Sequence, residues 1–244
     1  PASHIIKKQR KHQKGLNQYE KEIDALSITG VVQEQGELFK VDLTSYIDTG
    51  LFFDHRPLRN LIRENSSGKS VLNLFCYTGS ISLYAASGNA RRVEACDLSN
   101  TYLSWAKENF LLNGFTDKNK FHFIKGDVMQ ILDEKIESFE PENRYDIIIL
   151  DPPTFSNSKM AKSTLDINKD WPNLVYKCLN LLNPMGTLYF STNSKRLIFE
   201  RNLIPQATKN GYSILASDIT EQTIPEDFKG SNPHTAYELR VGKK

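Results

Sequence analysis

Short apolar runs alternate with longer amphipathic segments from about residue 70 to residue 210. The apolar runs have the length of buried parallel strands, and the segments between them repeat apolar residues at helical spacing. Strands are predicted at 71–75, 92–96, 121–125, 145–150 and 187–191. Helices are predicted at 80–87, 100–113, 128–135, 171–182 and 199–210. This alternation predicts a doubly wound, mostly parallel α/β sheet with helices on both faces.

The C-terminal end of the chain departs from the alternation. Residues 213–218 and 236–241 can pair as an antiparallel hairpin, which would complete a seven-stranded sheet. A generic doubly wound fold lacks this ending. We therefore expect residues 66–244 to form one α/β domain.

The N-terminal end also differs, and we treat residues 1–65 as an extension. Segments 27–32 and 38–43 flank a turn at Gln35-Gly36 and predict a small β-hairpin. Pro57 suits the first turn of a helix that runs to about residue 62.

Composition and charge add limits to this picture. The chain has 244 residues, of which 39% are hydrophobic and 25% are charged, as in ordinary globular domains. No apolar run approaches the roughly 20 residues that span a bilayer, and no signal peptide is visible, so we expect a cytoplasmic protein without membrane contact. The three cysteines lie far apart and no Cys or His pair has metal-ligand spacing, so no metal is expected.

The net charge is only +2, but basic residues gather near the start of the chain. They precede the first acidic residue, Glu20, and comprise Lys7, Lys8, Arg10, Lys11 and Lys14. Such a basic arm could bind phosphates, or it could simply be a solvated terminus.

Residues 151–159 carry the strongest chemical signal. Asp151-Pro152-Pro153-Thr154-Phe155 follows the apolar run 145–150, and the carboxyl end of a central strand is where open α/β sheets bind ligands. This segment resembles the acid-Pro-Pro-aromatic signature loop of methyltransferases that act on nitrogen in nucleic acid. Asp151 could accept a hydrogen bond from an exocyclic amine or bind the cofactor, and the prolines would fix the loop. Phe155 could stack on an extruded base or pack in the core.

The turn after the first strand of the domain resembles the first motif of class I S-adenosylmethionine-dependent methyltransferases. Of its three glycine positions only Gly79 is a glycine; Phe75 and Tyr77 hold the others, and Asn73 replaces the usual acid. Because a dinucleotide needs these glycines for its pyrophosphate, the pattern argues against NAD.

Acids also follow the next two strands. Asp97, with Leu98 behind it, stands where an acid binds the ribose of an adenosine. Asp127, with Val128, stands where an acid and an apolar side chain can hold adenine. Helix capping is the competing explanation for both acids. The candidate cofactor-binding residues within the domain are Asn73, Phe75, Thr78, Gly79, Asp97, Leu98, Asp127, Val128 and Asp151.

Methylation of a pyrimidine carbon would need a nucleophilic cysteine after strand 145–150 or strand 187–191. Residues 151–154 and 190–194 contain none. Methylation at nitrogen is therefore favoured.

Taken together, these segments resemble the 7-methylguanosine-forming half of the bacterial bifunctional 23S ribosomal RNA guanine methyltransferase family. The resemblance covers nearly the whole chain and rests on residues 10–19, 41–56, 72–80, 151–159, 218–220, 225–228 and His234. It implies a class I, Rossmann-like fold with S-adenosylmethionine as cofactor, and transfer of a methyl group to a guanine nitrogen, with N7 favoured.

The resemblance also implies that residues 48–56 cover the cofactor, with Asp54 and Arg56 as polar candidates for binding it. A salt bridge or a helix cap is the alternative for these two residues. The basic arm would bind ribosomal RNA, and an N2-guanine methyltransferase domain, fused or separate, would be a partner.

Three alternatives stay open. The first is an N2-guanine or N6-adenine methyltransferase that uses Asp151 to align the nitrogen lone pair. The second is an RNA-binding module with a decayed active site. A small-molecule methyltransferase is the third, although it would not explain the basic arm.

Overall fold

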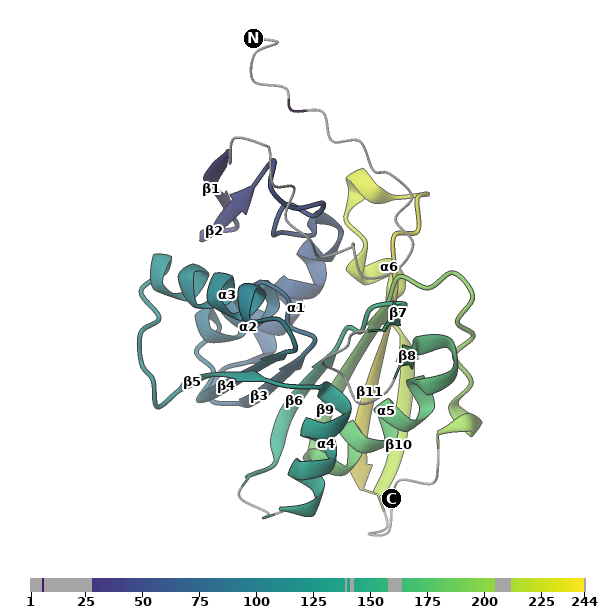
Figure 1. Ribbon diagram of the computed structural model, residues 1–244. Helices are drawn as coiled ribbons and strands as arrows, with labels where there is room; N and C mark the ends of the chain where they lie inside the picture. Colours follow the sequence, from purple (N-terminus) through teal and green to yellow (C-terminus); the bar gives the residue numbers. More distant parts are fainter. Residues whose placement is uncertain are drawn as a thin grey trace.

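The computed structural model describes residue 6 and the ranges 28–138, 140, 143–157, 164–204 and 212–243. The predicted basic arm lies outside the described residues. The centre of the molecule is a seven-stranded sheet in the order β10-β11-β9-β6-β3-β4-β5 (Figure 1). Its strands are β3 (Ser70–Leu74), β4 (Arg92–Asp97), β5 (Phe121–Lys125), β6 (Tyr145–Leu150), β9 (Leu182–Thr192), β10 (Tyr212–Asp218) and β11 (Thr235–Lys243).

Five neighbouring strands of this sheet are parallel, β11 runs in the opposite direction, and β10 at the edge runs in the same direction as the five. β6 pairs with both β3 and β9 in parallel, whereas β11 is antiparallel to β9 and β10 is antiparallel to β11. The parallel strands are apolar along most of their length because both of their faces are covered. The predicted fold and the C-terminal hairpin are therefore confirmed.

Helices cover both faces of the sheet (Figure 1). One core contains residues of α1 (Arg56–Asn65), α2 (Ser80–Ser87) and α3 (Asn100–Leu112). The opposite core contains residues of α4 (Val128–Glu137) and α5 (Ile167–Leu181). Trp171 and Phe190, in the second core, are among the largest fully buried side chains and stack on each other.

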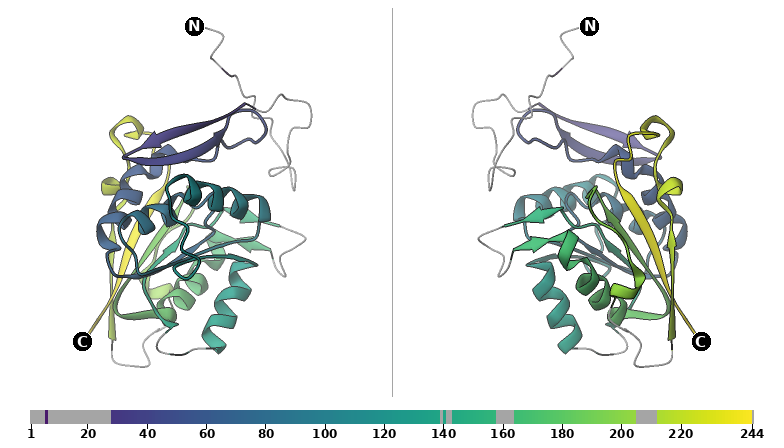
Figure 2. Two further views of the ribbon diagram at one scale, coloured as in Figure 1. Left: turned by 90° about the vertical axis from the view of Figure 1, so that its left-hand side faces the viewer. Right: turned by 90° about the vertical axis from the view of Figure 1, so that its right-hand side faces the viewer.

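The described part of the N-terminal extension packs on the domain. Its hairpin, β1 (Thr29–Glu34) and β2 (Glu37–Asp42), lies across the end of the sheet above α3 (Figure 2). The Asn109 side chain accepts a hydrogen bond from the Lys40 backbone at 2.9 Å. Arg59 of α1 makes a buried two-point ion pair with Glu34, at 2.7 and 2.9 Å. The hairpin is thus tied to two helices.

One predicted helix is wrong in its described part. Of residues 199–204, only Arg201–Leu203 form a single 3-10 turn, and 205–211 lie outside the described residues. Phe199 instead stacks on Tyr237 at 4.2 Å and packs on Trp171 at 4.9 Å between ring centroids. This contact with the core outweighs the local helical pattern.

Several further elements are short and were not predicted. They are η3 (Phe53–His55), β7 (Phe155–Ser156), β8 (Leu165–Asp166), η5 (Arg201–Leu203), α6 (Thr220–Thr223) and η6 (Glu226–Phe228). Among the predicted elements, α5 and β9 start clearly earlier than expected, at Ile167 and Leu182. Within the described ranges, no helix has the length and apolar character needed to cross a bilayer.

Candidate functional site

The candidate site lies where the order of the strands reverses. The chain moves from β3 outward to β4 and β5, then returns to β6 on the other side of β3. Leu74 and Leu150, the last residues of β3 and β6, are register partners. The loops that follow these two strands therefore begin side by side, at the kind of switch point where open α/β sheets bind ligands.

The loop after β3 keeps the backbone of a glycine-rich turn with few glycines. Phe75, Tyr77 and Gly79 have φ angles of 56°, 51° and 73°. A side chain at Gly79 would place its Cβ 2.8 Å from the Cβ of Ala106. Left-handed conformations cost non-glycine residues about 1–2 kcal/mol each, so surrounding contacts must hold this turn.

Asp97, at the end of β4, supplies one of those contacts. Its Oδ2 accepts a hydrogen bond from the Tyr77 backbone at 2.9 Å, and its Oδ1 accepts one from the Ser99 backbone at 2.8 Å. Burial raises the pKa of Asp97, and these backbone hydrogen bonds offset the rise in part. Each oxygen of a carboxylate has a second lone pair, so Asp97 can hold the loop and still accept two ligand hydroxyls.

The other candidate cofactor residues divide into those that lie just after β4 and β5 and those that are buried within the fold. Asp127 caps α4 by accepting from the Met129 backbone at 3.0 Å, Val128 is buried, and Leu98 is half-buried beside Asp97. Asn73 and Thr78 are buried and bonded within the fold. Asn73 donates to Ser82 at 2.8 Å, and Thr78 donates to the Gly50 carbonyl at 2.6 Å.

The Asp151 loop lies on the other side of the switch point. Ser191 of β9 donates a hydrogen bond to Asp151 Oδ1 at 2.6 Å. Pro152 is buried and Pro153 is half-buried, which anchors the turn. Phe155 is 55% exposed, so packing in the core does not explain it. Ser158 and Lys159 lie outside the described residues.

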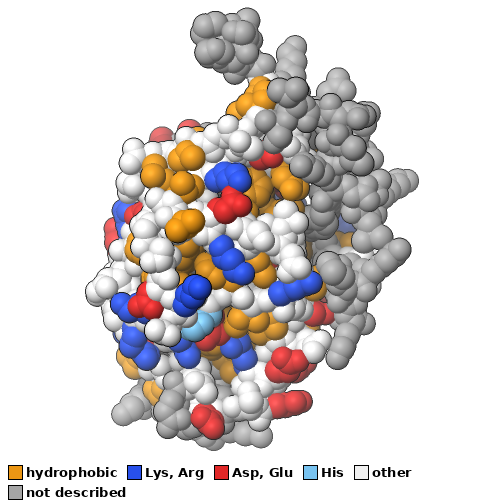
Figure 3. Space-filling model, turned by 60° about the vertical axis from the view of Figure 1, so that its left-hand side comes forward, with side chains coloured by type: hydrophobic (Ala, Val, Ile, Leu, Met, Phe, Trp, Pro, Cys, Tyr) orange, Lys and Arg blue, Asp and Glu red, His pale blue; other side chains and the backbone are white. Residues whose placement is uncertain are grey.

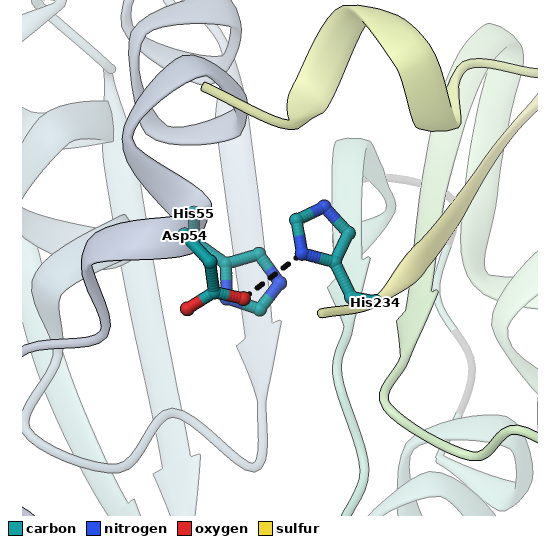
Figure 4. Close-up of side chains that lie close together, drawn as sticks. All are labelled: Asp54, His55 and His234. Carbon is teal, nitrogen blue, oxygen red and sulfur yellow. Dashed lines mark hydrogen bonds and ion pairs between the residues drawn. The ribbon is translucent and has the colours of Figure 1, made fainter. Parts of the chain in front are cut away.

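Three side chains from two distant segments of the chain, Asp54 and His55 from one and His234 from the other, lie close together (Figure 4). His234 donates from Nδ1 to Asp54 Oδ2 at 2.9 Å, and His55 stacks on His234 with ring centroids 4.3 Å apart. Burial pushes the pKa of Asp54 up, but the hydrogen bond from His234 and the two histidine charges outweigh it and lower the pKa. Nε2 of His55 lies 4.0 Å from Asp151 Oδ2.

Sequence reasoning placed His234 in a similar segment without a role and did not single out His55 or Ser191. Their partners are far away in the chain: His234 lies 180 residues from Asp54, and Ser191 lies 40 residues from Asp151. The only available signal was that His55 sits between the candidates Asp54 and Arg56. Arg56 itself forms an ion pair with Asp227.

The cysteines are unsuited to nucleophilic chemistry. Cys76, Cys96 and Cys178 are all buried. Burial raises the pKa of each thiol, to about 12 for Cys96 and well above the ordinary value for Cys76. A thiol attacks as its thiolate, so these side chains are inert at neutral pH.

The fold and the site by themselves indicate a class of protein. The sheet order, the antiparallel C-terminal hairpin, the left-handed turn after β3 and the acids after successive strands are those of a class I methyltransferase. The turn leaves a half-buried carboxylate at Asp97 with acceptor capacity, which fits the ribose of S-adenosylmethionine.

The comparison with known families agrees. The model of the S-adenosylmethionine-dependent methyltransferase family matches residues 4–236, and the chain belongs to this family. Its cofactor is S-adenosylmethionine. Among solved structures, SMU.776, a proposed methyltransferase complexed with SAH, has 26% identity and a TM-score of 0.73 over 87% of this chain and 56% of that one.

Two curated relatives are more similar in sequence. Both are named ribosomal RNA large subunit methyltransferase K/L. The protein of Magnetococcus marinus is 43% identical over 96% of this chain and 31% of its own length. The protein of Shewanella loihica is 44% identical over 94% of this chain and 30% of its own length. The chain thus spans about a third of the length of these relatives.

Proposed function

We propose that this protein transfers the methyl group of S-adenosylmethionine to a guanine nitrogen of large-subunit 23S ribosomal RNA, with N7 as the favoured atom. The observation that carries the proposal is the Asp151 loop. It presents an anchored carboxylate and an exposed aromatic ring at the switch point, without a cysteine. The names of the K/L relatives support ribosomal RNA as the substrate. Since ribosomal RNA is made in the bacterial cytoplasm, we place the reaction there.

In this proposal, the cofactor supplies an electrophilic methyl group and the protein supplies alignment and exclusion of water. Asp97 holds the ribose hydroxyls, while Asp127 and Val128 hold the adenine. Leu98, Phe75 and Gly79 line the turn beneath it, and Asn73 and Thr78 fix that turn from behind. Asp151 faces the target base with its Oδ2, and Phe155 stacks on it. Pro152 and Pro153 keep both side chains in place.

Nitrogen is favoured over carbon as the acceptor atom because carbon methylation of a pyrimidine needs a thiolate. All three cysteines are buried and their thiol pKa values are raised. Guanine N7 carries a free lone pair and needs no deprotonation, which suits a site whose polar group is a carboxylate. The N2 atom of guanine and the N6 atom of adenine are the second candidates, because Asp151 Oδ2 could accept a hydrogen bond from an exocyclic amine.

The extension contributes a cover to the site in this proposal. Residues 48–56 lead from the hairpin to α1, and Asp54 and Arg56 are held by His234 and Asp227, near the C-terminal end of the chain. We keep the division into residues 1–65 and 66–244, with the basic arm as the RNA-binding part of the extension. The N2-guanine methyltransferase domain, fused or separate, remains the proposed protein partner, and no metal is needed.

The molecular surface supports the binding of RNA through contacts that are spread over one face. Figure 3 shows Lys and Arg side chains spread among hydrophobic ones on the face that contains α3 and β5. Mixed basic and apolar surfaces suit RNA, whose phosphates and unstacked bases need both kinds of contact.

The test is a reaction of the purified protein with unmodified 23S ribosomal RNA and methyl-labelled cofactor, followed by nucleoside mass spectrometry. Label in 7-methylguanosine supports the proposal. Label in N2-methylguanosine or N6-methyladenosine favours the second candidates. No cofactor binding by calorimetry would indicate a decayed site.

A further inference from the structure

His55 lies at the centre of a chain of polar groups that reaches the target side of the site. The side chain is 10% exposed, and its Nε2 has no hydrogen-bond partner in the described structure. That atom lies 4.0 Å from Asp151 Oδ2, while Nδ1 lies 3.7 Å from Asp54 Oδ2. One imidazole is therefore placed between two carboxylates from different segments.

His234 fixes this imidazole from the side. Its ring stacks on His55 at 4.3 Å with 15° between the ring planes. Its own nitrogens are both engaged, Nδ1 with Asp54 at 2.9 Å and Nε2 with Thr223 at 3.0 Å. The position of His55 is thus set by η3, by α6 and by the segment before β11.

Three such side chains also raise the question of a metal ion, since their ligand atoms lie within 4.8 Å of one another. The lone pair of an imidazole nitrogen lies in the ring plane. Two rings stacked nearly parallel direct their lone pairs into separate planes, so they do not converge on one ion. The geometry favours a hydrogen-bonded chain.

We propose that His55 is a positioning residue that sets the place and charge of Asp151 at the target base. A shift of roughly 1 Å brings His55 Nε2 within hydrogen-bond distance of Asp151 Oδ2. Ser191 holds the other oxygen, so the carboxylate would be fixed at both ends. The idea rests on the proposed function in one respect, which is that Asp151 faces the base.

The proposal implies that the protonation of His55 controls the site. Burial lowers the pKa of His55; the nearby Asp151 and Asp54 charges oppose this, while His234 and Arg59 add to it, and the net shift is downward. Neutral His55 has one N–H group, which can donate a hydrogen bond to Asp151, and the Asp151 carboxylate then keeps its negative charge. Protonated His55 forms an ion pair that neutralises the carboxylate, so turnover should fall as His55 takes up its proton.

A histidine titration by NMR tests the contact without any RNA. In the wild-type protein we expect the pKa of His55 to lie below its ordinary value of 6.5. In Asp151→Asn it should fall further, because the negative charge that raises it is gone. The half-buried His122, on the edge strand β5, serves as the internal control, and its NMR signal should be the same in both proteins. An unchanged His55 pKa in Asp151→Asn would overturn the proposal.

Kinetics then test the role. His55→Ala should lower kcat roughly tenfold, as expected for one hydrogen bond to a charged group, with cofactor affinity preserved. Glutamine can donate a hydrogen bond but cannot titrate, so His55→Gln should recover most of kcat. Its kcat should no longer fall near the pKa measured for His55. His122→Gln is the matched control. The same fall in His55→Gln, or wild-type kcat in His55→Ala, would contradict the proposal.

These outcomes separate the two proposals. If the wild-type protein methylates a nucleoside other than 7-methylguanosine, the proposed N7 specificity fails, while the titration and the kinetics still test His55. Loss of activity on chelator treatment that Zn²⁺ restores would instead overturn the hydrogen-bonded chain.

Discussion

The two sides of the switch point are built in different ways. On the β4 side, Asp97 and Asp127 are held by hydrogen bonds from backbone groups two residues further along the chain, at 2.8 and 3.0 Å. On the β6 side, Asp151 is held by Ser191 and faced by His55, and His55 is stacked on His234. The first half is assembled by strand ends and helix caps. The second half exists only once the sheet, the extension and the C-terminal segment have packed together.

This difference suggests a division of work. A cofactor that is shared by many methyltransferases can be held by local turns. The target base differs between enzymes, and in the proposed function the groups that face it come from peripheral segments that can vary without changing the sheet. Substitutions on the two sides should therefore change different quantities.

The largest expected effect is on turnover, from Asp151→Ala. Loss of the carboxylate that we propose faces the base should lower kcat by about 100-fold or more, within the range for positioned acid–base or hydrogen-bonding groups. Cofactor affinity by calorimetry should stay close to that of the wild-type protein. Ser191→Ala, which frees one carboxylate oxygen, should lower kcat less. If Asp151→Ala keeps wild-type kcat, Asp151 is structural.

Asp97→Ala should have the converse effect, on binding. The variant loses the acceptor for the Tyr77 and Ser99 backbone groups, and in the proposed function it also loses the acceptor for two ribose hydroxyls. We expect the Kd for S-adenosylmethionine to rise about 100-fold or more. Glu137→Ala, at an exposed site on α4, is the matched control. Unchanged affinity in calorimetry, with the variant folded by circular dichroism, would remove Asp97 from the cofactor site.

Phe155→Ala sharpens the comparison within the β6 side. Because the ring is 55% exposed, the substitution should leave the melting temperature unchanged. Loss of one stacked base is worth about 1–3 kcal/mol, so the KM for RNA should rise roughly 5- to 150-fold. Leu215→Ala, at another exposed apolar site, should leave KM as it is. A lower melting temperature with unchanged KM would make Phe155 a packing residue.

The smallest expected effect is on the pH dependence of stability. The pKa of His55 is lowered by burial, so below pH 6.5 the unfolded chain binds a proton more readily than the folded protein. This contribution to stability is complete above pH 6.5 and is lost as the pH falls toward the folded-state pKa. The free energy of unfolding, measured with urea at several pH values, should fall less steeply below pH 6.5 in His55→Gln than in the wild-type protein. The same pH dependence of the free energy of unfolding in His55→Gln and His122→Gln would contradict this prediction.

The sequence predicted the sheet and the position of the turn after β3 well for a physical reason. Strands such as 145–150 and turns such as 75–79 depend on nearby residues, and in that turn Ala106 leaves no room for a side chain at Gly79. Even so, the sequence did not indicate that Phe75 and Tyr77 would adopt positive φ angles.

The remaining features depend on long-range packing. The helix predicted at 199–210 fails in its described part because Phe199 packs on Trp171 and Tyr237. The contacts of His55 with Asp151 and His234 depend on segments that meet only in the folded protein. No local pattern encodes them, so the sequence could not predict that half of the site.

The most direct test of the central claim is nucleoside mass spectrometry of 23S ribosomal RNA from cells that lack this protein. We predict that one 7-methylguanosine is lost, that the wild-type gene restores it, and that the Asp151→Ala gene does not. Unchanged 7-methylguanosine, or loss of a methylated pyrimidine instead, would contradict the assignment of this site to guanine N7.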